Sequence, residues 1–121
     1  MADLHGPAEQ SARLSITETA AAGIRVLVLS GETDADNVNT LGRALQVKDG
    51  GLPHVVPDFR GVTFMDSSGV DALAAAYRAS EAADGWVRLA ALTAPIQRVV
   101  ELVGLDSVIS CYPTLPQALT A

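Results

Sequence analysis

Segments with the pattern of strands alternate along this chain with segments that have the apolar spacing of helices, and this order limits the fold more than any other feature. The strand-like runs lie at 13–23, 24–29, 55–59, 86–90 and 108–109. The helix-like segments lie at 38–48, from about 69 to 77, at 95–104 and at 115–119. Strands that are separated by helices need right-handed crossovers and a mostly parallel sheet. The first two strands follow each other closely, so we expect them to form an antiparallel hairpin.

The predicted fold is a single α/β domain with a mixed, mostly parallel β-sheet, an N-terminal hairpin and about four helices. A chain of 121 residues is long enough for one hydrophobic core but not for two. Residues 1–10 lack periodicity, so we expect a flexible N-terminal tail there and the domain at 11–121. Pro57 falls inside the third strand. Because proline donates no ladder hydrogen bond, it predicts a bulge, an edge position or a shortened strand.

The charge balance argues against two classes of partner. The chain carries a formal net charge of −6 at pH 7, and an acidic domain repels both the phosphates of nucleic acids and anionic membrane surfaces.

There is no apolar run long enough to span a bilayer and no pattern of a signal peptide. The single cysteine, Cys111, cannot form a disulfide within the chain. We therefore expect a cytoplasmic protein.

The segment that begins at Asp66 is the most informative part of the sequence. Ser68 and Asp71 have the spacing of a capping box at a helix start. If Ser68 caps the helix, Ser67 lies one residue outside it with a free hydroxyl, in front of the positive end of the helix dipole. Such a serine is a candidate phosphate acceptor. The alternative is that both serines are only turn and cap residues, which for an arbitrary Asp-Ser-Ser-Gly is the more common case.

Residues 31–37 form an acidic segment that could bind a divalent cation. The template of the calcium-binding loop of EF-hands requires an oxygen ligand and a glycine where this chain has Val38 and Asn39. A solvated acidic loop that ends in a helix capped by Asn37 is therefore the better interpretation.

Known catalytic motifs are not found in the sequence. It contains no phosphate-binding glycine motif, and Ser67 is not in a Gly-x-Ser-x-Gly nucleophile elbow. His54 is the only histidine that we expect to be ordered as a partner base. We therefore predict that the chain is not an enzyme and needs no metal or other cofactor.

Residues 58–70 closely resemble the signature of bacterial anti-sigma factor antagonists, which belong to the STAS-domain family. Their core is Phe-Met-Asp-Ser-Ser-Gly. Further segments resemble the family's loop after the second strand, its late helix and turn, and its C-terminal end; these are residues 29–34, 99–106, 112–115 and 118–119. The resemblance covers nearly all of the chain after the first ten residues.

The resemblance implies a function in the control of transcription. Members of the family bind an anti-sigma factor that is itself a serine kinase, and this binding frees a sigma factor. The kinase phosphorylates the serine that directly follows the aspartate, and a metal-dependent serine phosphatase reverses the modification. Here the phosphoacceptor would be Ser67, with Asp34 near it, in a protein that is monomeric when free. The implied partner-binding residues are Glu32, Asp34, Asp66, Ser67, Ser68 and Gly69.

Two other functions remain open on the sequence. A STAS domain without phosphorylation could be a subunit of a lipid-transport or other transporter complex, and the Asp-Ser-Ser-Gly turn does not exclude this. An enzyme could use Ser67 or the carboxylates of Asp34, Asp36 and Asp66 for phosphoryl transfer. The lack of a basic or metal-binding complement around these residues counts against an enzyme.

Overall fold

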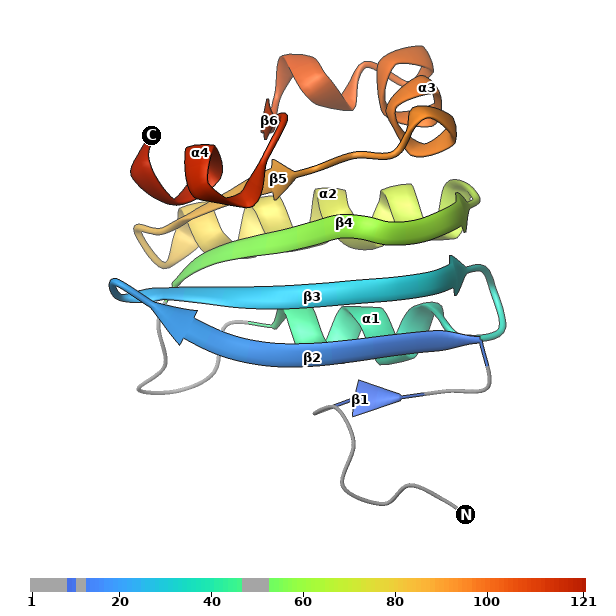
Figure 1. The fold of residues 1–121 in the computed structure, drawn as a ribbon, viewed down its shortest axis with the longest axis horizontal. Coiled ribbons are helices and arrows are strands. Elements are labelled where there is room, and N and C mark those ends of the chain that lie inside the picture. Colours follow the sequence, from blue (N-terminus) through green and yellow to red (C-terminus); the bar gives the residue numbers. More distant parts are fainter. Residues whose placement is uncertain (1–8, 11–12, 47–52) are drawn as a thin grey trace.

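The strands form one mixed sheet in which the order in space follows the order in the chain (Figure 1). The computed structural model describes residues 9–10, 13–46 and 53–121. In these residues the strands are β1 (Glu9–Gln10), β2 (Leu14–Ala21), β3 (Ile24–Thr33), β4 (His54–Met65), β5 (Trp86–Ala90) and β6 (Ser110–Tyr112). The pairs β1–β2 and β2–β3 are antiparallel, and the pairs from β3 to β6 are parallel. The predicted N-terminal hairpin and the parallel remainder of the sheet are confirmed.

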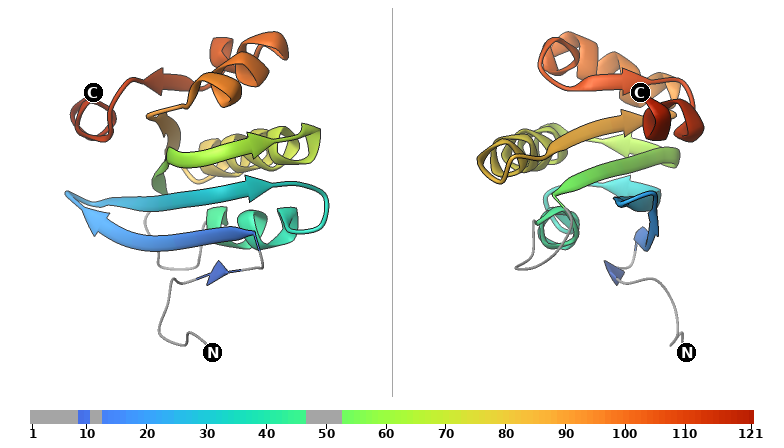
Figure 2. Two further views of the ribbon diagram at one scale, coloured as in Figure 1. Left: turned by 45° about the vertical axis from the view of Figure 1, so that its right-hand side comes forward. Right: turned by 90° about the vertical axis from the view of Figure 1, so that its left-hand side faces the viewer.

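The crossover helices all lie on one face of the sheet. They are α1 (Val38–Leu45), α2 (Ser67–Ala82) and α3 (Ala94–Leu102), and a 3₁₀ turn, η1 (Leu105–Ser107), follows α3. Right-handed crossovers between strands that follow one another in the sheet place every helix on the same side. The last helix, α4 (Leu115–Thr120), lies on the opposite face (Figure 2).

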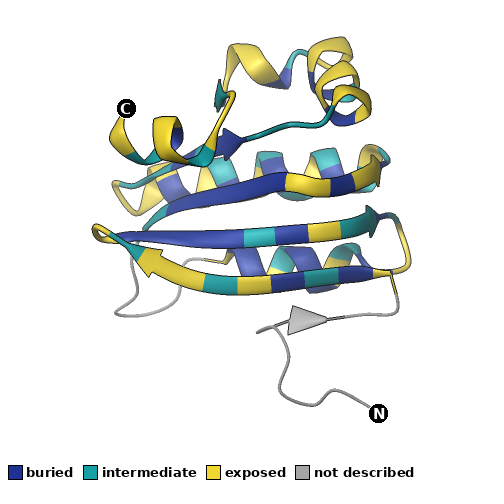
Figure 3. Cartoon of the chain, in the orientation of Figure 1, coloured by how far each residue is buried: buried dark blue, intermediate teal, exposed yellow. Residues whose placement is uncertain are grey.

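Two hydrophobic clusters hold these layers together. The larger cluster lies between the sheet and the three crossover helices (Figure 3), and its largest fully buried side chains include Phe59, Leu27, Leu41, Leu73 and Ile96. The smaller cluster lies under α4 and consists of Ile24, Val56, Ala90 and Ala118. No helix in the described ranges is both long and apolar enough to cross a membrane.

The structure excludes two of the three predictions made for Pro57. It is buried inside β4, a twelve-residue strand with partners on both sides, so the edge position and the shortened strand were both wrong. The ladder with β5 pairs residues on either side of Pro57 but not Pro57 itself. The irregularity in the β3–β4 register comes after it, between Val28 and Ser30. There the buried carboxylate of Asp58 accepts a hydrogen bond of 3.0 Å from the backbone N–H of Arg60.

Several element boundaries also differ from the predicted ones. The strands β3 and β4 run further than their apolar segments, to Thr33 and Met65, because they stay paired with each other as far as these residues. The last strand begins two residues later than expected, because the backbone N–H groups of Val108 and Ile109 donate to the carbonyl of Leu105 in the turn after η1. In the segment expected to be a tail, Glu9 and Gln10 form β1. The helix expected at 38–48 ends earlier, at Leu45, because Gln46 has an extended backbone. The rest of the expected tail lies outside the described residues.

A buried arginine links the hairpin to α1. The side chain of Arg25 is 6% exposed, and its guanidinium is bound in two places to the carboxylate of Glu18 on β2, at 3.1 and 3.2 Å. The same guanidinium donates to the backbone carbonyls of Ala44 and Gln46 at the end of α1. These carbonyls have no partner within the helix, so Arg25 acts as a C-terminal cap from a neighbouring strand.

Replacing this arginine should destabilise the fold. We expect Arg25→Met to lower the free energy of unfolding by about 3 kcal/mol, because it removes charged hydrogen bonds from buried carbonyls and a buried ion pair. The measurement is urea unfolding at neutral pH. Arg78→Met, at an exposed position on α2, is the control and should cost less than about 0.5 kcal/mol. Equal effects of the two substitutions would contradict this role of Arg25.

Candidate functional site

The ends of β3 and β4 bring together the two segments that the sequence singled out. The two strands are parallel neighbours, with Glu32 opposite Phe64 and Thr33 opposite Met65. Their carboxyl ends therefore lie at the same edge of the sheet, and the chain leaves that edge as the acidic segment on one side and as α2 on the other. The backbone N–H of Asp66 donates to the carbonyl of Thr33 at 3.3 Å, which joins the two segments.

The helix α2 is capped by Asp66 and not by Ser68. Asp66 has an extended backbone, and its carboxylate oxygen Oδ1 accepts from the backbone N–H of Ser68 at 3.0 Å and from the Ser68 hydroxyl. The helix consequently begins at Ser67, and Asp71 is exposed. The capping box predicted from Ser68 and Asp71 was therefore wrong. Aspartate and serine are both common N-cap residues, and the hydrogen bond between the Asp66 backbone and Thr33 is a tertiary contact that the local pattern does not contain.

Ser67 is the first residue of α2 and is exposed. The sequence predicted that Ser67 lies one residue before the helix. This was wrong, because Ser67 is inside the helix. Among the described residues, no hydrogen-bond partner of its hydroxyl is found, whereas the Ser68 hydroxyl is bound to Asp66. At the first turn of a sixteen-residue helix, Ser67 lies where the helix dipole favours negative charge. Of the two adjacent serines, Ser67 is the one whose oxygen is available for reaction.

Hydrogen bonds to the Asp66 carboxylate hold its pKa below the ordinary value of 3.8. The largest effect comes from the Ser68 hydroxyl. Partial burial acts in the opposite direction, and the backbone N–H groups of Ser68, Gly69 and Ala35 add to the lowering. Ala35 belongs to the acidic segment, so the same carboxylate that caps α2 also holds the acidic segment against the helix start.

This lowered pKa predicts a dependence of stability on pH. The charged form of Asp66 is favoured in the folded state, so its contribution is present above pH 3.8 and is lost as the pH falls through the lowered pKa. The free energy of unfolding of the wild type should therefore decline more steeply below pH 3.8 than that of Asp66→Asn. Urea unfolding of both proteins at a series of pH values between neutral and strongly acidic measures the difference. Parallel declines would show that the folded state does not favour the charged form.

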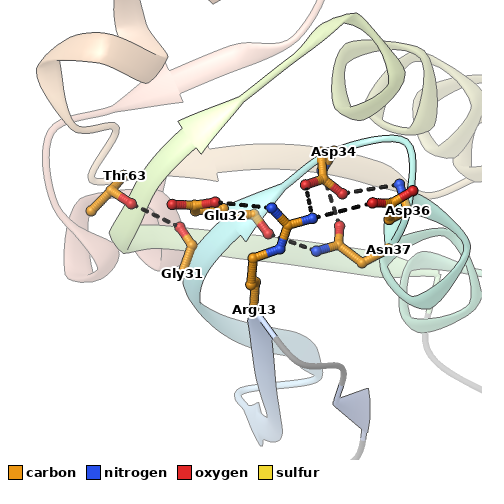
Figure 4. Close-up of polar contacts among 7 residues, drawn as sticks. All are labelled: Arg13, Gly31, Glu32, Asp34, Asp36, Asn37 and Thr63. Atoms are coloured by element: carbon orange, nitrogen blue, oxygen red, sulfur yellow. Dashed lines mark hydrogen bonds and ion pairs between the residues drawn. The ribbon is translucent and has the colours of Figure 1, made fainter.

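One arginine organises the acidic segment, and the sequence analysis did not identify it. The guanidinium of Arg13 contacts three carboxylates: Glu32 at 3.6 Å, Asp36 at 3.5 Å, and Asp34 (Figure 4). Asp34 is the least exposed of the three, with 16% of its side chain accessible. The backbone carbonyl of Arg13 also accepts from the N–H of Glu32 at 2.9 Å. The register of the hairpin, which pairs Leu14 with Gly31, was the signal that could have placed Arg13 beside Glu32.

Side-chain to backbone hydrogen bonds fix the rest of the acidic segment. The Asn37 side chain accepts from the N–H of Asp34 and donates to the carbonyl of Glu32, both at 3.0 Å, and Asp34 accepts from the N–H of Asp36 (Figure 4). Asn37 is thus at the N-cap position of α1, as predicted, but its side chain makes no capping bond to the helix. No cluster of three or more metal-ligating side chains suited to a metal ion occurs in the part of the chain that the structure describes.

Gly69 allows the helix to approach the sheet. A Cβ atom at this position would lie 2.4 Å from Cγ of Met65 and 2.8 Å from Oγ1 of Thr33, which is too close for either. Because Gly69 is buried, it belongs to the packing under the turn and not to the exposed surface.

The other predicted residues differ in how far they are exposed. Glu32, Asp34, Asp66 and Ser68 are half-buried, and Ser67 is exposed. His54, which the sequence analysis considered as a base, lies at the other end of β4, where it stacks on Trp86 with ring centres 4.7 Å apart. His54 is therefore not a partner of Ser67, which lies beyond the opposite end of β4.

The chain is similar to known proteins in sequence and in fold. The family model described as the STAS domain matches residues 15–118. An anti-sigma F factor antagonist of Paenibacillus polymyxa is 28% identical over 102 residues, which are 81% of this chain and 86% of that protein. The crystal structure of an anti-sigma factor antagonist from Mycobacterium paratuberculosis is 29% identical, has a TM-score of 0.77, and covers 88% of this chain and 92% of its own.

A second similar structure is the phosphorylated form of the Bacillus cell fate determinant SpoIIAA. It is 23% identical, has a TM-score of 0.69, and covers 88% of this chain and 97% of its own. At this level of identity the likeness establishes the fold alone.

Proposed function

Because this chain belongs to the STAS domain family, we propose that it is an anti-sigma factor antagonist controlled by phosphorylation of Ser67. It binds an anti-sigma factor that is a serine kinase, and this binding frees a sigma factor. The kinase then phosphorylates Ser67 and the complex separates, and a metal-dependent serine phosphatase restores the binding form. The observation that carries the proposal is the exposed Ser67 at the start of α2, next to the acidic segment.

The local contacts favour Ser67 over Ser68 as the phosphoacceptor. In the transfer, the Ser67 oxygen attacks the γ-phosphate of an ATP molecule bound by the partner, a P–O bond forms, ADP leaves and the hydroxyl proton is released. The Ser68 hydroxyl is bound to Asp66, so its reaction would first require the loss of that contact. The positive end of α2 helps the folded domain to accommodate the phosphate, by about 0.3–1 kcal/mol.

The same phosphate is unfavourable in a tight interface. It adds about −1.5 to −2 units of charge at pH 7, and the chain already carries −6. Asp66 and the acidic segment with Asp34 and Asp36 lie at the same edge of the sheet. A phosphate there is repelled by these carboxylates and must lose its hydration when a partner covers it. Phosphorylation therefore weakens binding while the fold is retained.

The proposed partner-binding surface consists of the turn and the acidic segment. Glu32, Asp34, Asp66, Ser67 and Ser68 supply its polar groups, and Gly69 supports it from below. We propose that the free protein is a monomer, that it acts in the cytoplasm without a cofactor, and that it is a binding protein and not an enzyme.

A displacement experiment tests this function. The probe is a complex of the sigma factor with the serine-kinase anti-sigma factor from the same genome. Addition of the wild-type protein should release the sigma factor, and the Ser67→Asp variant should release little. If the sigma factor stays bound with excess wild-type protein, the proposal is wrong. Recovery of the unmodified protein with a membrane ATPase would then favour the transporter-subunit alternative.

A further inference from the structure

The face of the sheet that carries α4 is partly open at the end nearest Ser67. α4 packs over Ile24, Val56 and Ala90, which belong to the other end of this face. It does not extend over the carboxyl ends of β3 and β4 (Figures 1 and 3). There, Phe64 exposes 48% of its surface, although most large apolar side chains of the sheet are buried.

Phe64 stands in a row with two charged residues on neighbouring strands. Glu32 of β3 is its register partner in β4, so the two side chains project from the same face of the sheet. Arg13, just before β2, contacts Glu32 from the other side (Figure 4). The side chains of Arg13 and Glu32 are 49% and 44% exposed. The row therefore presents one aromatic ring next to a polar rim, an arrangement typical of protein interfaces.

This row is continuous with the proposed partner-binding surface. Phe64 is two residues before Asp66, the cap of α2, and Glu32 is two residues before Asp34. We propose that the anti-sigma factor covers this row as well as the Ser67 turn, with the ring of Phe64 as the apolar anchor. This inference rests on the proposed function and extends its binding surface from the turn onto the α4 face of the sheet.

The charges around the row indicate what kind of partner fits it. Arg13 is one guanidinium among three carboxylates, those of Glu32, Asp34 and Asp36, so the rim has an excess of negative charge. The complementary surface is an apolar pocket for the ring, flanked by lysine or arginine side chains. A second copy of this chain would bring the same excess of carboxylates and is disfavoured as the occupant.

The test measures how substitutions of two exposed apolar residues change the affinity for the serine-kinase anti-sigma factor. We expect Phe64→Ala to weaken binding by at least about 30-fold, the effect of removing an interface anchor. Leu102→Ala, at a leucine that is 80% exposed near the end of α3, is the control and should change the affinity by less than about twofold. Phe64→Leu should have an intermediate effect. Thermal unfolding of each variant shows whether weaker binding comes from the loss of a contact or from the loss of the fold. Raised ionic strength should weaken binding of the wild type.

Other results would overturn the inference in distinguishable ways. If Phe64→Ala binds like the wild type while Ser67→Asp binds weakly, the surface ends at the turn and the proposed function stands. If the wild type does not bind the kinase, the proposed function is wrong and the inference is wrong with it. If the free wild type sediments as a dimer that Phe64→Ala dissociates without loss of kinase binding, a second copy covers the row.

Discussion

Phosphorylation of Ser67 is expected to lower the affinity for the anti-sigma factor several-hundred-fold, which corresponds to about 3–4 kcal/mol. The phosphate meets the carboxylates of Asp66 and of the acidic segment, and it must be desolvated under the partner. Ser67→Asp adds a smaller charge, so its effect should be weaker but in the same direction. Ser67→Ala should bind like the unmodified wild type and remain bound in the presence of ATP, because it cannot accept a phosphoryl group.

A serine elsewhere on the surface provides the control for this prediction. Ser110 is exposed on β6, which is the outermost strand on the side of the sheet opposite to β1. Ser110→Asp changes the net charge of the chain by the same amount as Ser67→Asp. Titration calorimetry with the kinase should show a large loss for Ser67→Asp and nearly wild-type binding for Ser110→Asp. Equal affinities of Ser67→Ala and Ser67→Asp would show that charge at this position does not control binding.

Gly31→Ala is expected to have the largest effect on stability among the glycine substitutions, because two effects add. Gly31 has φ of +103°, which side chains other than that of glycine rarely adopt, and a Cβ there would lie 2.0 Å from the carbonyl oxygen of Arg13. That oxygen belongs to the backbone and cannot move without the strand β2. We expect the free energy of unfolding to fall by about 3 kcal/mol or more.

The position of Gly31 also links stability to the site. The carbonyl that would clash accepts from the N–H of Glu32, and the same Arg13 holds the acidic segment. Gly31→Ala should therefore weaken kinase binding even where the variant is fully folded. Gly23→Ala is the control, because Gly23 has φ of +79° but free space around a Cβ. It should cost only about 1 kcal/mol and leave binding unchanged. Similar urea midpoints for the two variants would contradict this account.

The sequence was sufficient where local periodicity determines the structure. The strand expected at 86–90 has the same bounds as β5. The helix expected from about 69 to 77 lies within α2, and its Val70, Leu73 and Tyr77 pack on the main core. In these segments the buried positions recur at strand spacing, as Val87 and Leu89 do, or at helix spacing, as Leu73 and Ala76 do. Short-range spacing is hence enough to identify the element.

Long-range contacts account for the features that the sequence did not predict. The cap of α2 is Asp66 and not the predicted Ser68, because the Asp66 backbone is bound to Thr33, more than thirty residues earlier. Arg13 contacts the acidic segment because of the register of the hairpin. The sequence predicted the two strands of this hairpin but not their register. Each of these features depends on which strands are neighbours, and a local pattern does not contain that information.

The central claim is that Ser67 is a reversible phosphoacceptor, and one measurement tests it most directly. The protein is isolated from its native cells before and after a change of growth conditions, and its intact mass and modified residues are determined. The account predicts a form heavier by one phosphoryl group, with the phosphate on Ser67 and an abundance that changes with conditions. A protein that is unmodified under every condition, or that carries the phosphate on Ser68, would contradict it.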